Sequence, residues 1–284
     1  MNFQSRSQNE SVLFCAYIYQ LINSEHQNAE AYLAYLIIVI WLFKAINYCY
    51  TSLFNKHASS EAFLKASKEF EQKASNTPEL FQLHAEATKL LNIFKSNSKM
   101  VYEHSLHATK WTGKSNTIYK MILYDGKYVD IKVHVLSEGM EETSFHNHTQ
   151  HMMLCNLAGD YFHTSWNINY NKPGVLYKFK HEKGGKTSKE PEMINGTLEY
   201  VDTSNYQPGN WRCLNPSTIH TIKAGVTNER VISFIIRSKL DQNKDRFIVS
   251  KQPKLDIKPD ADGTGNVFGD ERIGVLKYIV SAVQ

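Results

Sequence analysis

The stretch that decides the fold is residues 143–159, TSFHNHTQHMMLCNLAG. Its alternating pattern predicts a strand over Ser144–Leu157, which ends at a glycine turn. Side chains two apart on a strand point the same way, so His146 and His148 project together while His151 faces away. Imidazole is a ligand for most first-row metals. The pattern therefore predicts a metal site with two ligands on one strand.

His220 is the best candidate for a third ligand, which has to come from another part of the chain. It lies near the start of an apolar strand, Ile219–Ala224, and follows the turn residues Asn215-Pro216. A second apolar strand, Val231–Ser238, comes soon after it. Many short strands separated by turns are typical of a β-sandwich or a β-barrel, so we expect the three histidines to meet inside a barrel.

The order HxH, a long insertion and a lone histidine near the start of a strand resembles the two-part motif of the cupin superfamily. The matching positions are Gly139, His146, His148, Gly159, Gly209, Pro216 and His220. The glutamate of that motif is missing, and Met152 or Met153 stands in its place. The resemblance implies a mainly β protein, a cupin (double-stranded β-helix) barrel preceded by an α-helical N-terminal region.

A cupin site of three histidines without the carboxylate is the arrangement of cysteine dioxygenase and its thiol-dioxygenase relatives. Here His146-Asn-His148-Thr149 resembles the H-x-H-T segment of that family. Asn215–His220 is similar to its third-ligand segment, and Arg230–Arg237 to the strand that follows. In cysteine dioxygenases this last strand carries Ser-x-His-x-Tyr, whose His and Tyr assist catalysis. The corresponding places hold Ser233, Ile235 and Arg237, which argues against cysteine as the substrate.

We therefore expect a metal-dependent cupin, a non-haem iron dioxygenase that acts on a small molecule with O2. Three neutral imidazoles leave Fe(II) its full charge and open positions; Zn, Ni, Cu and Mn are alternative metals. The candidates for substrate binding are Gln150, Met152, Arg212 and Arg237, and no catalytic residue is identified. Two alternatives stay open. One is a non-oxidative isomerase or lyase that uses the metal as a Lewis acid, and the other is a ligand-binding or interaction module.

A β-hairpin is predicted by Thr117–Tyr124 and Tyr128–Leu136, which flank the turn signal Asp125-Gly126. In its second strand the residues with odd numbers are apolar, and the other face carries Asp130, Lys132 and His134. That parity predicts that His134 is a surface residue. His163 either lines the barrel or lies on its surface. Further strands are expected at Tyr161–Asn169, Val175–Lys180, Gly196–Val201 and Trp211–Leu214.

The N-terminal residues, from about 11 to 97, predict helices. Ser59-Ser60-Glu61 is a start signal for a helix that runs to Ala74, and Thr77 is expected to cap the next helix. The uncharged segment Ala31–Phe43 predicts a helix that is buried or covered by a partner, with membrane contact as the alternative. At the other end, Gln252–Gly269 is predicted to be a loop, followed by the helix Glu271–Val283 with Asp270 as its cap.

These patterns divide the chain into a helical region (1–110), the barrel (111–250), and a loop with a C-terminal helix (251–284). Composition limits the possible partners and the cellular compartment. With 32 Lys and Arg against 28 Asp and Glu, the net charge is only +4, and no basic stripe predicts nucleic-acid binding. The four scattered cysteines favour free thiols in a reducing compartment. We expect a cytoplasmic protein, and either a homo-oligomer or peripheral membrane association through the N-terminal helices is compatible with the sequence.

Overall fold

The computed structural model of the chain describes residues 29–77, 79–110, 117–142, 144–180, 188, 190–225, 229–240, 245–255 and 264–283. The chain divides into two compact units, residues 1–55 and 56–284, and the second unit holds all the described strands. The helical segments of the described part are α2 (Ala29–Ala74), η1 (Leu80–Leu83), α3 (His84–Ser96), η2 (Ser98–Glu103) and α4 (Gly269–Val283), of which η1 and η2 are 3₁₀ helices. The division at residues 110 and 250 stays a prediction.

Helix α2 ends at Ala74, as the sequence predicts, but it does not begin at Ser59-Ser60-Glu61. It runs through these residues without a break from Ala29. No glycine or proline occurs between Ala29 and Ala74, and a serine inside a helix costs only roughly 0.5 kcal/mol relative to alanine. The predicted start signal was therefore wrong because nothing in the preceding residues stops the helix.

The two predicted helix caps are also wrong. Thr77 does not cap the next helix, because the chain first forms η1 and α3 begins only at His84, with Leu83 in the cap position. The buried side chains of Leu80 and Leu83 hold this 3₁₀ turn against the core, so packing sets the start of the helix. Helix α4 begins at Gly269, which places Asp270 in its first turn, where a carboxylate still interacts favourably with the helix dipole.

The apolar segment Ala31–Phe43 lies near the start of α2. Among its described side chains, those of Ile37, Ile38, Ile40, Trp41, Leu42 and Phe43 are exposed. The expectation of burial within the chain is therefore not met at these residues. No helix in the described part of the chain is long and apolar enough to span a membrane.

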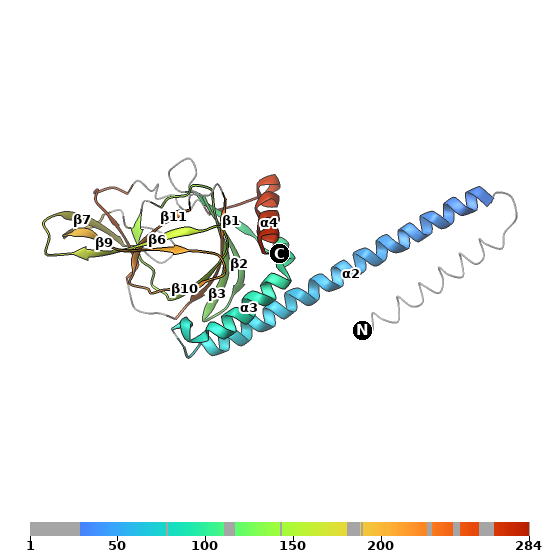
Figure 1. Ribbon diagram of the computed structural model, residues 1–284, viewed down its shortest axis with the longest axis horizontal. Coiled ribbons are helices and arrows are strands. Elements are labelled where there is room, and N and C mark those ends of the chain that lie inside the picture. The colour runs from blue at the N-terminus through green and yellow to red at the C-terminus, as the bar shows by residue number, and fades with distance from the viewer. Residues whose placement is uncertain are drawn as a thin grey trace. The chain divides into compact units, whose positions relative to one another are not determined.

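The described strands form two antiparallel sheets of seven strands each, which lie side by side in the ribbon (Figure 1). The first sheet has the order β10 (Trp211–Leu214), β5 (Met152–Ala158), β12 (Val231–Ser238), β3 (Val129–Leu136), β2 (Thr117–Asp125), β1 (Leu106–Lys110) and β14 (Thr264–Asn266). The second has the order β8 (Glu192–Asn195), β7 (Val175–Lys180), β13 (Phe247–Ser250), β4 (Phe145–His146), β11 (Ile219–Ala224), β6 (Tyr161–Asn169) and β9 (Thr197–Tyr206). This is a mainly β architecture of two antiparallel sheets preceded by a helical N-terminal region, as the sequence predicts.

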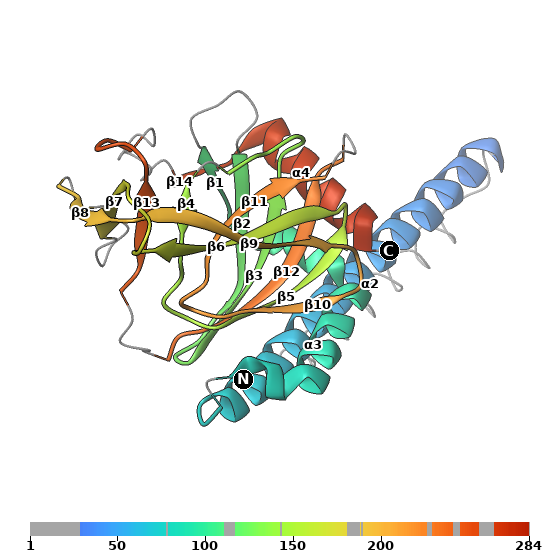
Figure 2. The ribbon, with the colours of Figure 1, turned by 60° about the vertical axis from the view of Figure 1, so that its left-hand side comes forward.

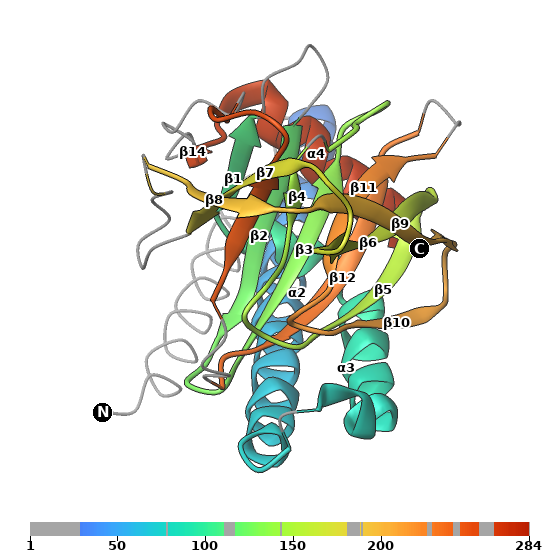
Figure 3. The same ribbon diagram turned by 90° about the vertical axis from the view of Figure 1, so that its left-hand side faces the viewer.

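The outer face of the first sheet is covered by helices (Figures 2 and 3). The largest core cluster joins residues of α3, α4 and the C-terminal part of α2 to the outward-facing side chains of this sheet. At its centre Phe94 of α3 lies with its ring centroid 5.3 Å from that of Phe234 and 6.3 Å from that of Phe63. The apolar face of strand β3, from Val129 to Val135, belongs to the same cluster.

The polar face of β3 consequently points into the barrel, and the prediction that His134 is a surface residue was wrong. His134 pairs with Lys120 on β2 and with Ser233 on β12, and its Nε2 atom is buried. The predicted parity of the strand was correct. The side to which each face of β3 points was misjudged. The helices cover the apolar face, so the hydrophobic core lies outside the barrel wall and the polar face lines the interior.

The predicted strand Ser144–Leu157 is in fact two strands in different sheets. Strand β4 ends at His146, the chain bends at residues 149–150, and β5 begins at Met152. This crossing from one sheet to the other closes one side of the barrel. Strand β9 extends beyond the predicted Gly196–Val201 to Tyr206, and β1, β8, β13 and β14 were not predicted. Strand β14 lies within the predicted loop Gln252–Gly269 and pairs with β1.

Candidate metal centre

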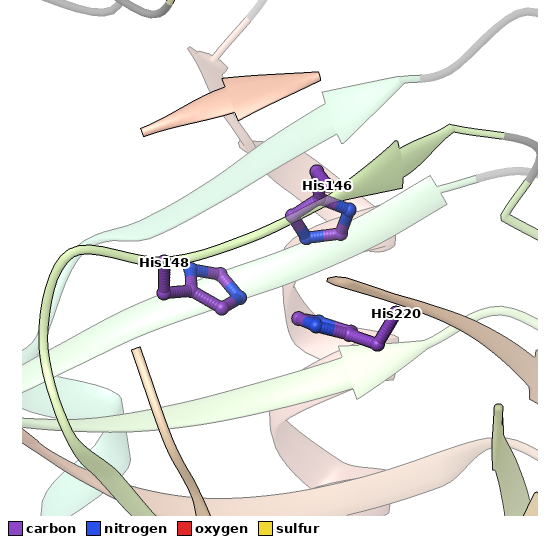
Figure 4. Close-up of side chains that lie close together, drawn as sticks. All are labelled: His146, His148 and His220. Carbon is purple, nitrogen blue, oxygen red and sulfur yellow. The ribbon is translucent and has the colours of Figure 1, made fainter. Parts of the chain in front are cut away.

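Three histidine side chains converge between β4 and β11 (Figure 4). His146 on β4 pairs directly with His220 on the antiparallel strand β11, which places the two side chains on the same face. His148 follows β4, and its backbone N–H donates a hydrogen bond to the carbonyl of Pro216, 3.2 Å away. The segment before β11 thus holds the third ring in place. The ring centroids lie 4.4 to 5.0 Å apart.

Backbone carbonyls orient two of the rings. Nδ1 of His146 lies 3.2 Å from the carbonyl oxygen of Ser144, and Nδ1 of His220 lies 3.1 Å from that of Thr218. If Nδ1 carries the proton and donates to these carbonyls, Nε2 keeps its lone pair for a metal. A carboxyl oxygen of Glu142 lies 3.6 Å from Nδ1 of His146 and further restricts this ring. Sequence reasoning missed Glu142, although it shares the alternation of Ser144 and His146.

The spacing of the three side chains fits a metal ion after a small adjustment. One nitrogen from each of His146, His148 and His220 lies within 4.8 Å of the others. An ion about 2.1 Å from each nitrogen in a tetrahedral arrangement requires nitrogen–nitrogen separations of about 3.4 Å. Movements of each ring by less than about 1 Å therefore suffice, and the donor set suits a first-row transition metal.

Burial keeps the three imidazoles neutral. Removal from water lowers the pKa of His146 to about 4 and takes the pKa values of His148 and His220 well below their usual 6.5. The neighbouring histidines and Arg246 lower all of these values further. Neutral imidazoles have a free lone pair at physiological pH, so a metal ion does not have to displace protons.

Acidification is expected to destabilise the metal-free protein. The folded-state pKa values of His146 and of a further buried histidine, His163, are about 4. Between pH 6.5 and 4 the unfolded chain therefore binds more protons, and stability falls as the pH falls. Burial raises the pKa of Glu142 to about 8, so between pH 4.5 and 8 this group makes the folded chain more stable as the pH falls. Its effect is that of one group, whereas several buried histidines act in the other direction. At pH 5 the loss is on the order of 2 kcal/mol from His146 alone.

Thermal unfolding of the metal-free protein at pH 7.5 and at pH 5.0 measures this loss. We expect a lower midpoint at pH 5.0. An equal or higher midpoint at pH 5.0 would contradict a desolvated, neutral histidine cluster.

His163 is a fourth histidine beside the cluster, and the sequence left its position open. It is buried on β6, where its ring stacks on His220 with centroids 4.7 Å apart and on Tyr206 with centroids 5.2 Å apart. Its Nε2 atom is buried and makes no hydrogen bond to any residue that the structure describes. His163 on β6 pairs with Ile222 on β11, and β11 also pairs with β4, which carries His146. These pairings bring His163 to the histidine cluster. The stacking fixes the plane of His220.

The four predicted substrate-binding residues have different surroundings. Met152 and Arg237 are paired neighbours on β5 and β12, and Arg237 forms an ion pair with the buried Asp130. Gln150 is half-buried in the bend between β4 and β5. Arg212 is exposed on β10, with its guanidinium 5.6 Å from the ring centre of Tyr206.

The structure also decides which methionine stands nearest the place of the missing glutamate. Met153 is fully buried in the core beneath the helices, so its side chain points away from the barrel interior. Met152 has the opposite parity and is half-buried. Of the two methionines, Met152 is therefore the one that remains a candidate for contact with a substrate.

Comparison with known proteins finds only distant structural similarity. No protein-family model matches the sequence, and no curated protein matches it. A cupin superfamily protein from Desulfitobacterium hafniense is 11% identical, with a TM-score of 0.27 over 44% of this chain and 81% of the other. A cupin 2 conserved barrel domain protein from Rhodopseudomonas palustris is 11% identical, with a TM-score of 0.29 over 49% and 73%. A crystal structure of DMSP lyases is 11% identical, with a TM-score of 0.32 over 67% and 97%. These values carry no conclusion about activity.

Proposed function

We propose that the chain is a metal-dependent cupin in which His146, His148 and His220 bind Fe(II), and that it oxidises a small molecule with O2. The observation that supports this most is the convergence of three imidazole nitrogens without a carboxylate in the same group of described residues. A neutral ligand set leaves the ion its full double charge and open positions. Bound Fe(II) supplies electron transfer towards O2 and a Lewis acid for the substrate.

The chain itself supplies the orientation of the site. The carbonyls of Ser144 and Thr218 and the carboxyl group of Glu142 fix the ring planes and tautomers, as residues around metal ligands commonly do. The apolar cluster that lines the barrel, with Leu136, Leu154 and Ile235 among its members, limits the access of water. A dry site strengthens electrostatic interactions with a substrate and protects reactive species from side reactions.

The inner wall near β12 is held by a network of polar groups. The hydroxyl of Ser233 donates to Oδ1 of Asn156 at 2.7 Å, and Nδ2 of Asn156 donates to the carbonyls of Gly159 and Tyr206. These contacts lie where the register of β12 against β5 shifts. Gly159 has a φ of +63°, and a Cβ there would meet the carbonyl oxygen of Arg230 at 2.8 Å. The turn after β5 therefore requires glycine and fixes this wall of the barrel.

Anaerobic preparation with Fe(II) tests the proposal without a known substrate. We expect about one iron per chain, bound through the histidines. Nitric oxide, which occupies the position expected for O2, should give the electron paramagnetic resonance signal of a high-spin iron–nitrosyl complex. As a control, the His84→Ala variant removes an exposed histidine of α3 and should keep its iron. An iron-loaded sample that gives no nitrosyl signal would contradict oxidation with O2, and bound zinc or nickel without oxygen uptake would favour Lewis-acid chemistry.

A further inference from the structure

The inner side of the barrel carries an excess of positive charge near the histidines. Lys120 on β2 and Arg246, which directly precedes β13, are half-buried. Lys120 pairs with His134 on the inward face of β3. Arg246 lies two residues before Ile248, the partner of His146 in the second sheet. The two cations thus reach the same interior from opposite sheets, and each acts electrostatically on His146.

The carboxylates of this interior do not balance that charge. Asp130 is almost fully buried, but Arg237 and Lys132 already pair with it. Glu142 lies 3.6 Å from Nδ1 of His146 and acts electrostatically on both Lys120 and Arg246, but it is one carboxylate against two cations. Neither Lys120 nor Arg246 makes a hydrogen bond or an ion pair with a residue in the described part of the chain.

Neighbouring cations disfavour the charged form of both groups. Burial, Arg246 and Lys132 together lower the pKa of Lys120 to about 8. Burial and Arg237 lower the pKa of Arg246. Desolvated charges without a partner are costly, so a bound counter-charge would stabilise this arrangement. A bound divalent metal ion at the histidines would increase the excess positive charge.

His134 adds a polar atom that also lacks a partner. Its Nε2 is buried and makes no hydrogen bond within the described ranges. Burial and the nearby Lys120, Lys132 and Arg237 hold its pKa well below the usual value. A neutral imidazole can donate one hydrogen bond to an oxygen acceptor. An oxyanion between the cations would satisfy this donor if Nε2 carries the proton.

We propose that the interior binds a doubly charged oxyanion group, of the phosphate type, between Lys120, Arg246 and His134. Two unpaired cations match a double negative charge, and an approach from two sheets suits oxygens that point in several directions. A guanidinium and an ammonium group together are common partners of phosphate. The inference rests on the proposed function in one respect, namely that the anion is part of the substrate that lies beside the metal.

Inorganic phosphate is the probe for this site. The full-length chain, as isolated and after removal of metal with a chelator, is titrated with phosphate, and with acetate at matched ionic strength. We expect phosphate to raise the thermal midpoint in both samples and acetate to have at least tenfold weaker affinity. The Lys120→Met and Arg246→Met variants should each bind phosphate at least tenfold more weakly. Equal affinity for acetate, or unchanged phosphate affinity in both variants, would overturn the proposal.

A second measurement separates a binding role from a structural one. Without phosphate, Lys120→Met should have a higher thermal midpoint than the unmodified chain, because it removes a desolvated cation that lacks a partner. The matched control is Lys251→Met, which removes an exposed lysine and should change neither the midpoint nor phosphate affinity. A lower midpoint for Lys120→Met would overturn the proposal.

Metal content, measured in the same samples, distinguishes the two proposals. Phosphate binding by a chain that takes up no iron would support the anion site and contradict the proposed function. Iron uptake without phosphate binding in either sample would overturn the anion site alone.

Discussion

Replacing Phe94 with alanine is expected to lower the free energy of unfolding by about 3–5 kcal/mol, the usual cost of removing a buried phenylalanine side chain. Phe94 has no exposed surface, and its ring lies between Phe63 of α2 and Phe234 of β12. The variant would leave a cavity at the centre of the contact between the helices and the first sheet. For a fold of this size we expect the thermal midpoint to fall by roughly 6–20 °C.

Phe81 provides the matched control for this experiment. It lies on η1, close to Phe94 in the sequence, but its side chain is 68% exposed. Phe81→Ala should therefore change the stability by less than about 0.5 kcal/mol. A small effect for Phe94→Ala, similar to that of Phe81→Ala, would mean that the helices do not cover the outer face of the first sheet.

The helix-covered face also explains which parts of the fold the sequence could predict. Alternating or apolar stretches between clear turn signals located β2, β3, β6, β7, β10, β11 and β12. These patterns could not show where the apolar face of β3 points. In a barrel without helices, the apolar face usually fills the interior. Here helices cover it, which depends on contacts between residues as far apart as Phe94 and Phe234.

The same limit applies to the strands that sequence reasoning missed. Strand β13, Phe247–Ser250, is only four residues long, and it is held by pairing with β4 and β7. Both partners lie far earlier in the chain than β13, and a short strand that is held only by such distant pairings has too weak a local signal for prediction. Arg246 directly precedes this strand, so local patterns could not place it near His146.

The three-histidine cluster was predictable because its signal is partly local. His146 and His148 occur together, and His220 follows a turn and lies near the start of a strand. Among the surrounding groups, Glu142 shares this local alternation, but His163 and Lys120 have no such signal. They reach the site through pairings between strands, and only the tertiary structure shows which inward-facing polar residue lies next to which.

Loss of His220 is expected to abolish metal binding. A change in a group that only supports a ligand commonly reduces metal affinity 10- to 100-fold, so removal of a ligand should exceed about 100-fold. His220→Ala should therefore retain less than about one tenth of an equivalent of iron after gel filtration. Because the imidazole is desolvated and neutral, its removal should not unfold the metal-free chain, and circular dichroism checks this.

His163→Phe tests whether the site needs three histidines or four. Phenylalanine keeps a flat ring in the stack between His220 and Tyr206, but it has no nitrogen to bind a metal. If His163 only fixes the plane of His220, this variant keeps about one iron per chain while His220→Ala loses it. Equal loss of iron in the two variants would show that His163 is also a ligand. Unchanged iron content in folded His220→Ala would contradict the three-histidine site itself, because the remaining pair, His146 and His148, would then be sufficient.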